Sequence, residues 1–254
     1  MHIIFRKVLQ QNAKNVIKGG YFIQNKIHKQ IGALFLSLVL CLTLLPMSVL
    51  AYDYPSQAIE NLSIGKAEIT EKTYYIVSDG TVTSDGASAD DYNVYYDNTT
   101  LTLNNAKLAS AIYVPGGTTI ELIGENVSGS EDKKVSIGIQ AFSSGSITIT
   151  GSGSYEVYTD YEGIATVYGN TDSPNGDIFI EGGTIDMHGA PISTRYGGIT
   201  ISGNADVNAG AISTGGNPND EEAQRARDII IQGNAKVRAE EISNLQKIIL
   251  RGNA

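Results

Sequence analysis

The sequence predicts an all-β solenoid, a parallel β-helix of about seven irregular coils, and the first observation behind this fold is an internal repeat. The segment 199–209 returns as a near copy at 229–239 and in part at 248–254, and its opening pattern recurs at 147–151 and 178–182. Successive units begin roughly 19 to 31 residues apart, which is typical of solenoids. The units begin at Leu101, Ile120, Ile147, Ile178, Ile199, Ile229 and Ile248.

The second observation is the alternation of apolar and polar residues inside each unit. Ile199 and Ile201 are separated by Thr200, which is typical of a strand with one buried face. From the unit at Ile120 onward, a glycine follows the second apolar residue by two positions, as Gly203 does here. Because glycine tolerates a positive φ, we expect a corner at this position.

The third observation is that each unit continues with a second short strand and a third apolar position, and no helical pattern follows. The second strand contains Val157, residues 185–187, Val207 and Val237. The third position holds Ile112, Ile139, Ile164, Ile192, Ile212 and Ile242. A leucine-rich repeat is disfavoured because its Leu-x-x-Leu-x-Leu frame is absent. An antiparallel sandwich is disfavoured because the units return in phase rather than as mirrored hairpins.

One coil alone is not expected to be stable. It buries about four or five side chains at roughly 1.5 to 3 kcal/mol each, while ordering roughly twenty residues costs about 1 to 2 kcal/mol apiece. Stability therefore belongs to the stacked array. Asn204, Asn234 and Asn253 follow the glycine in three units, where amides bonded along the stack and simple Gly-Asn turns are both open interpretations.

Residues 1–51 are expected to be a signal peptide with a basic leader. Residues 1–30 carry basic but no acidic side chains, residues 31–50 are almost wholly apolar, and residues 49–51 suit a signal peptidase. A membrane anchor is the alternative, and Pro46 favours cleavage.

The mature chain would then have no membrane span and no cysteine, because the only cysteine lies in the apolar segment. It would keep 12 basic against 27 acidic side chains, a net charge of about −15. Such an acidic, secreted chain is not expected to bind nucleic acid.

Two further regions follow. Residues 52–98 lack the repeat, and 74–77 and 92–96 are expected to be strands of an N-terminal β cap that covers the first coil. Residues 99–254 carry the repeats. The chain stops in mid-coil at Ala254, so further C-terminal coils or domains are expected.

Four segments carry a resemblance: Tyr-Asn-Val-Tyr-Tyr at 92–96, Leu-Thr-Leu-Asn-Asn-Ala at 101–106, residues 112–122, and Gly-Ser-Ile-Thr-Ile-Thr-Gly at 145–151. They resemble the β-helical repeat region of large secreted or cell-surface proteins of Gram-positive anaerobes, which are often labelled carbohydrate-binding. This resemblance implies a right-handed parallel β-helix. The wider group of right-handed β-helices includes polysaccharide lyases and hydrolases, so an enzyme must be considered.

Polysaccharide cleavage needs clustered carboxylates, or carboxylates that hold Ca²⁺ beside a basic residue. The best candidates are Asp186 and His188 with Arg195. The position of Asp186 is taken by Asn208 and Arg238 in the next units, so we favour solvated surface side chains.

The segment 170–177 loosely resembles a calcium loop, but its spacing is wrong for an EF-hand and it lacks the final Glu. A polar turn is therefore favoured over a weak Ca²⁺ site. The candidate ligands are Asn170, Asp172, Asn175 and Asp177.

Aromatic side chains offer the faces on which sugar rings stack, and several tyrosines lie close together in the sequence although the chain has no tryptophan. Strand propensity alone also explains such tyrosines. The candidates for glycan contact are Tyr155, Tyr158, Tyr161, Tyr168 and Tyr196. A second surface feature is an apolar outward column, which we expect a loop to cover. The column consists of Phe179, Thr200, Ile230 and Ile249.

These observations predict a non-catalytic extracellular binding or scaffold module of a cell-surface protein, glycan-binding or adhesive, with a glycan or a host or cell-surface protein as partner. No cofactor is expected apart from the weak Ca²⁺ site. The alternative is a β-helical polysaccharide lyase or hydrolase.

Overall fold

The computed structural model describes residues 61–142, 145–167, 176–195, 197–215, 228–244 and 247–252. Contacts divide the chain into two units, residues 1–56 and 57–254, and every described residue belongs to the second. The expected signal peptide, residues 1–51, therefore lies outside the described residues. Where the structure describes the chain, no helix has the length and hydropathy that a membrane crossing needs.

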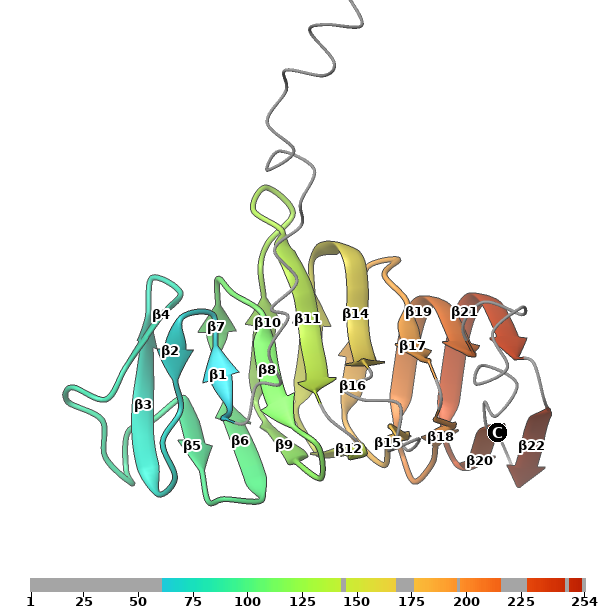
Figure 1. The fold of residues 1–254 in the computed structure, drawn as a ribbon, viewed down its shortest axis with the longest axis horizontal. Coiled ribbons are helices and arrows are strands. Elements are labelled where there is room, and N and C mark those ends of the chain that lie inside the picture. The colour runs from blue at the N-terminus through green and yellow to red at the C-terminus, as the bar shows by residue number, and fades with distance from the viewer. Residues whose placement is uncertain are drawn as a thin grey trace, which may run out of the picture. The chain divides into compact units, whose positions relative to one another are not determined.

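The described residues form an all-β unit of two sheets (Figure 1). The ten-stranded sheet runs, in spatial order, through β22 (Ile248–Gly252), β20 (Ile229–Gly233), β18 (Ile199–Ile201), β15 (Ile178–Ile180), β12 (Ile147–Gly151), β9 (Thr119–Ile123), β6 (Thr100–Asn104), β5 (Val94–Tyr96), β3 (Thr73–Ser78) and β4 (Thr81–Thr83). The other sheet runs through β2 (Ala67–Glu68), β1 (Ser63–Ile64), β8 (Ile112–Pro115), β11 (Val135–Phe142), β14 (Thr159–Val167), β17 (Ile192–Thr194), β19 (Asp206–Thr214), β16 (Thr184–Asp186), β13 (Ser154–Val157), β10 (Glu125–Ser128) and β7 (Lys107–Leu108), and β21 (Lys236–Asn244) also pairs with β19.

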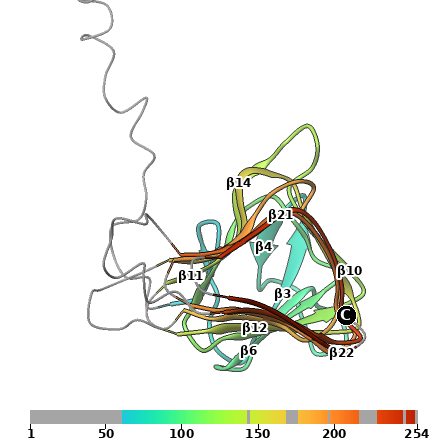
Figure 2. The ribbon, with the colours of Figure 1, turned by 90° about the vertical axis from the view of Figure 1, so that its right-hand side faces the viewer.

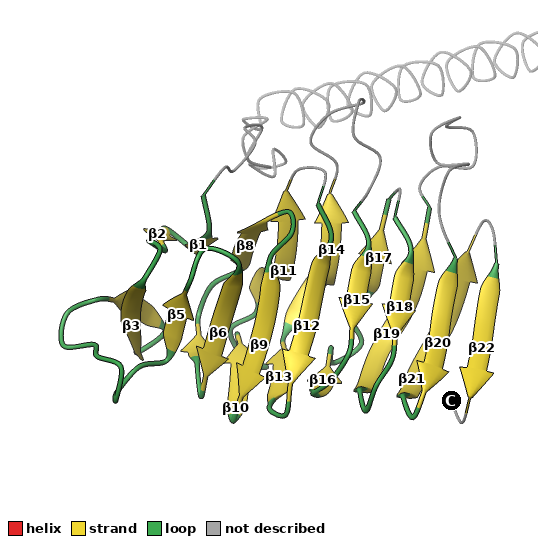
Figure 3. Ribbon diagram, turned by 90° about the horizontal axis from the view of Figure 1, so that it is seen from below, coloured by secondary structure: helices red, strands yellow, loops and turns green. Residues whose placement is uncertain are grey.

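The strands stack as three walls, which Figure 2 shows along the stack. We call β6, β9, β12, β15, β18, β20 and β22 the first wall, which Figure 3 shows face on. The second wall contains β7, β10, β13 and β16, and the third contains β8, β11, β14 and β17. β19 joins the last two walls, because its start pairs with β16 and its end pairs with β17. All pairs within these walls are parallel and follow chain order, which is a solenoid-like arrangement.

The in-phase return of the units is confirmed by the strand register. In the first wall, Ile178 lies opposite Ile199, which lies opposite Ile229, which lies opposite Ile248. The predicted third apolar positions also lie opposite one another in the third wall. These residues are Ile112, Ile139, Ile164, Ile192, Ile212 and Ile242. The first five belong to one hydrophobic core that the walls surround, and the partly buried Ile242 packs against it.

One predicted register is wrong. Ile120 lies opposite Ile149 rather than Ile147, so this pair of units is displaced by two residues. The glycine that stacks next to Gly124 is Gly153: a Cβ added to Gly153 would lie 2.5 Å from the Gly124 carbonyl oxygen. A Cβ on Gly151 would likewise lie 2.3 Å from the Leu122 carbonyl oxygen, so both glycines permit close backbone approach at this corner. A displacement of two residues keeps every side chain on its own face of the sheet, so the buried pattern alone cannot reveal it.

Antiparallel strands precede the parallel walls. β3 pairs with β4 and β5, and β5 pairs with β6, all antiparallel. β1 pairs antiparallel with both β2 and β8. The two strands expected around 74–77 and 92–96 are therefore present as β3 and β5, although β5 begins only at Val94.

The expected hydrogen bonding of asparagine amides along the stack is present in part. The side-chain amide of Asn234 donates to the side-chain oxygen of Asn204 at 3.4 Å, and both residues are exposed. Asn253 lies outside the described residues. The contact is long and solvated, so its contribution to stability is small.

Candidate functional site

Of the five tyrosines proposed for glycan contact, Tyr155 is wrong because it lies in the core. Its side chain is fully buried, and its hydroxyl donates to Ser128 Oγ at 2.9 Å. Burial raises the pKa of this phenol strongly. Tyr155 lies two residues before the inward Val157 on β13, so the pleat of the strand directs both side chains inward. Tyr168 and Tyr196 lie outside the described residues.

Tyr158 lies at the surface, at the corner between the second and third walls. Its ring stacks on the imidazole of His188, with centroids 3.9 Å apart and planes 18° apart. The two residues come from successive coils, since Tyr158 follows β13 and His188 follows β16. The structure therefore brings together a proposed glycan-contact residue and a proposed catalytic residue that the sequence treats as separate.

A shallow pocket lies beside this stacked pair, and we call it the corner pocket. Its volume is about 380 Å³, and it is lined by Glu131, Lys134, Tyr158, Thr159 and His188. Glu131 and Lys134 belong to the connection between β10 and β11, which extends beyond the neighbouring corners in Figure 1. Corners of three successive coils thus build one pocket. This arrangement was not visible in the sequence, because the connection between β10 and β11 lies outside the repeat.

Carboxylates surround the stacked pair. His188 Nε2 lies 3.3 Å from Glu156 Oε2, and the Tyr158 hydroxyl lies 3.5 Å from the same oxygen. Desolvation raises the pKa of Tyr158, and Glu156, Asp186 and Glu131 raise it further by opposing the charge of a phenolate. This part of the surface is therefore electronegative, although Lys134 adds a positive charge that is paired with Asp160.

Asp186 has a structural role in the described contacts. Its Oδ1 accepts hydrogen bonds from the backbone N–H of His188 and from the side-chain amide of Asn208, both at 3.0 Å. The first bond supports a left-handed turn, since His188 has φ +46°. Arg195, the third member of the predicted catalytic group, follows β17 in the third wall, whereas Asp186 ends β16 in the second. Arg195 and Asp186 therefore lie on different walls.

Tyr161 and the calcium candidates have the following positions. Tyr161 is 58% exposed on β14. Of the calcium candidates, Asn170, Asp172 and Asn175 lie outside the described residues, and Asp177 Oδ1 accepts the backbone N–H of Gly198 at 2.7 Å. Within the described ranges, no group of three or more His, Cys, Asp or Glu side chains is placed to hold a metal ion.

The apolar outward column is confirmed in register. Phe179 lies opposite Thr200, Thr200 opposite Ile230, and Ile230 opposite Ile249. All four side chains are partly exposed on the outer face of the first wall.

A second aromatic group, which the sequence analysis does not predict, lies at the antiparallel strands: Tyr74 is on β3, Tyr95 is on β5, and Tyr92 precedes β5. The rings of Tyr74 and Tyr95 stack 4.4 Å apart, and Tyr92 lies 5.2 Å from Tyr74. The doublets Tyr74-Tyr75 and Tyr95-Tyr96 contain the signal, because one tyrosine of each doublet must face outward on a pleated strand.

Comparison with known proteins adds no assignment: no protein-family model, no curated protein and no solved structure matches the chain.

Proposed function

We propose that the chain is a non-catalytic extracellular binding module whose corner pocket contacts a glycan. The observation that carries this proposal is the stack of Tyr158 on His188 at the wall of the corner pocket. An aromatic ring at a pocket wall offers an apolar face, and the nearby carboxylates accept hydrogen bonds from hydroxyl groups. Ligand pockets combine these two kinds of surface.

The finer architecture belongs to the same proposal. The walls are taken as a right-handed parallel β-helix of about seven coils with an N-terminal β cap, as the resemblance to β-helical surface proteins implies. Residues 1–51 would be removed on export, and the mature chain would be secreted or held at the cell surface. A stiff stack that repeats weak contacts suits multivalent binding or adhesion. Sequencing the N-terminus of the exported chain tests this processing, and a start at Tyr52 is expected.

The binding proposal is tested with a glycan array and the purified chain. Tyr158→Ala should weaken binding about tenfold, since an aromatic contact is worth about 0.5–1.5 kcal/mol beyond its area. Thr200→Ala, on the outer face of the first wall, is the control and should bind as the unaltered chain does. If the chain binds no glycan, the proposal fails. If Tyr158→Ala binds as well as the control, the corner pocket is not the site.

Polysaccharide cleavage is the second candidate, because His188 lies 3.3 Å from the Glu156 carboxylate and near Asp186. The test is the release of reducing ends or unsaturated products from pectin-like polymers, with and without Ca²⁺. Turnover that His188→Ala abolishes would replace the binding proposal with an enzyme. Absence of turnover under both conditions would remove this candidate.

A further inference from the structure

We propose a second glycan-contact surface on the outer face of the ten-stranded sheet, built from Tyr74, Tyr92 and Tyr95, and we assign it to an uncharged oligosaccharide. We call these three residues the tyrosine triad. The ligand class rests on the proposed function. The choice of these three residues does not rest on it, since none of them lines the corner pocket.

The triad is a compact cluster of partly exposed rings. Tyr74 on β3 lies directly opposite Tyr95 on β5, and their rings are nearly parallel, with planes 20° apart. The Tyr92 ring is tilted by 59° to that of Tyr74 and meets Tyr95 edge-on at 6.3 Å. The stack therefore presents ring faces and edges at the protein surface rather than in the core.

The hydroxyl groups distinguish the triad from the inward tyrosines beside it. Tyr75, next to Tyr74, is buried and its hydroxyl accepts the backbone N–H of Thr70 at 2.7 Å. Tyr96, next to Tyr95, is buried and donates to the Asn98 carbonyl at 2.8 Å. Within the described part of the chain, the hydroxyls of the triad make no hydrogen bond to protein. Three phenol groups are thus open to a ligand.

The Glu121 carboxylate lies near the triad on the same face of the sheet. Tyr95 lies opposite Thr102, and Thr102 lies opposite Glu121. Thr102 Oγ1 donates to Glu121 Oε2 at 3.3 Å, which draws the carboxylate over the buried threonine. Glu121 is two strand spacings from Tyr95, or about 9.5 Å along the sheet. An acceptor at this distance from an aromatic ring suits the hydroxyl groups of a sugar whose C–H face covers the ring.

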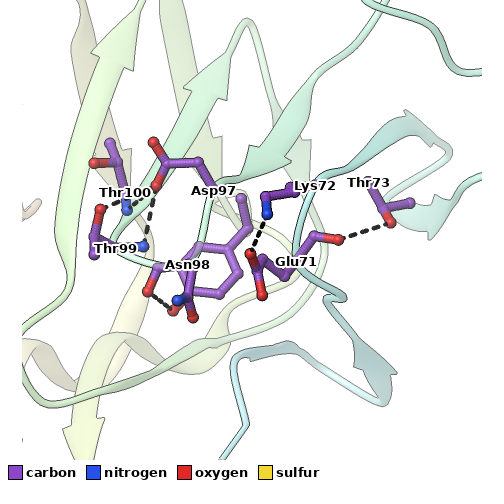
Figure 4. Close-up of polar contacts among 8 residues, drawn as sticks. Glu71, Lys72, Thr73, Asp97, Asn98, Thr99 and Thr100 are labelled. Atoms are coloured by element: carbon purple, nitrogen blue, oxygen red, sulfur yellow. Dashed lines mark hydrogen bonds and ion pairs between the residues drawn. The ribbon is translucent and has the colours of Figure 1, made fainter.

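The charges near the triad favour an uncharged ligand. The Lys72 ammonium is paired with the Glu71 carboxylate at 3.0 Å, as Figure 4 shows. Glu121 then adds a negative charge to an already acidic chain. A uronic-acid polymer would be repelled, whereas a neutral oligosaccharide would not. An apolar protein partner fits poorly, because it would leave the triad hydroxyls and Glu121 without partners.

The strands that carry the triad are held by local polar contacts. Asp97 Oδ1 accepts the backbone N–H groups of Thr99 and Thr100 at 3.0 and 2.7 Å, which closes the turn from β5 to β6 (Figure 4). These bonds also hold the pKa of Asp97 below its usual value. The Lys72 N–H donates to the Tyr96 carbonyl at 2.6 Å, which ties the start of β3 to β5. A surface fixed in this way loses little entropy on binding.

Tyrosine nitration with tetranitromethane tests the inference on the full chain. In the free protein, Tyr74, Tyr92 and Tyr95 should be nitrated, and the buried Tyr75 and Tyr96 should stay largely unmodified. Saturating cellohexaose or xylohexaose should lower nitration of the triad several-fold, and hexagalacturonate should not. Protection by hexagalacturonate to the same extent would overturn the assignment to an uncharged ligand. Absence of protection by both neutral probes would overturn the inference.

Variants separate this inference from the proposed function. Tyr95→Ala should weaken binding of the protecting hexasaccharide about tenfold, Tyr95→Phe should weaken it less, and Thr200→Ala should leave it unchanged. Circular dichroism checks that each variant is folded. If only Tyr158→Ala weakens binding, the triad is not a site and the corner pocket stands. If only Tyr95→Ala does, the triad stands and the corner pocket is wrong. If no glycan binds the chain, both proposals fail.

Discussion

The inner and outer faces of the same strands use tyrosine in opposite ways. On the inner face, Tyr75, Tyr96 and Tyr155 are buried and each hydroxyl is bonded inside the protein. On the outer face, the triad tyrosines contact one another, and Tyr158, at the corner that follows β13, stacks on His188. The residue type is the same, so the phase of the pleat decides whether a tyrosine stabilises the fold or remains available for binding.

The comparison predicts the largest loss of stability for an inner tyrosine. Tyr155→Ala should lower the free energy of unfolding by about 3–5 kcal/mol. It leaves a cavity in the core, and the stacked coils hold their spacing, so the cavity cannot collapse. Tyr158→Ala, its outer counterpart, should lower it by less than about 1 kcal/mol. Urea denaturation of both variants measures the difference. Equal losses would show that the pleat does not separate structural from surface tyrosines.

Asn126 shows how the inner face accommodates a polar residue. It lies opposite Tyr155 and is 1% exposed. Its side-chain oxygen accepts the N–H of Ala106, and its amide donates to the carbonyls of Ile123 and Ser154. One side chain therefore joins backbone groups just before β7, at the end of β9 and at the start of β13.

Asn126→Ala should destabilise the protein by about 2–3 kcal/mol, because it leaves buried backbone groups without partners. The control is Asn234→Ala, whose amide makes one exposed bond of 3.4 Å to Asn204. Its effect should be within about 0.5 kcal/mol. Thermal and urea unfolding compare the two variants. A loss at Asn234 that matches the loss at Asn126 would show that exposed asparagine stacking matters more than the inner bonds.

A smaller change isolates the hydroxyl of the inner tyrosine. Tyr155→Phe keeps the ring and removes the bond to Ser128, so a loss of about 1 kcal/mol is expected. Tyr158→Phe should leave stability unchanged, since its hydroxyl makes only a long contact of 3.5 Å to Glu156. The double variant Tyr155→Phe with Ser128→Ala checks the assignment: the two losses should not add.

Much of the fold could be predicted because its physical cause is periodic. Alternating residues in units that return in phase specify which side chains are buried, and the isoleucines of the third wall lie opposite one another as expected. The register between Ile120 and Ile149 could not be predicted in this way. The positions of Gly151 and Gly153 are both compatible with the buried pattern, and both glycines closely approach the backbone of the preceding coil, so neither signal selects the register.

The candidate sites were harder to predict, because they depend on which corners meet. Nearness in sequence to Tyr158 and Tyr161 does not show that Tyr155 is inward, whereas its alternation with Val157 on β13 does. The corner pocket combines residues from coils of unequal length, so no sequence spacing reveals it. The triad could have been found, since each tyrosine doublet must place one ring outside.

Glu162 is a half-buried carboxylate, intermediate between the buried inner side chains and the exposed outer ones, and the smallest effect is expected here. Burial raises its pKa, and the hydroxyl of Ser193, which donates to it at 2.8 Å, partly opposes the shift. A raised pKa means that the folded chain binds this proton more tightly than the unfolded chain. Glu162 therefore favours folding fully below its ordinary value of 4.5, and that contribution is lost as pH rises through the raised pKa.

Glu162→Gln should remove this dependence while keeping an acceptor for Ser193. Unfolding free energies from about pH 4 to about pH 7 should fall less with pH for the variant than for the unaltered chain. Glu125→Gln, at an exposed carboxylate, serves as the control for the loss of one carboxylate. A steeper fall in Glu162→Gln would mean that the ionised carboxylate is the form the fold prefers, and that this position belongs with the solvated outer face.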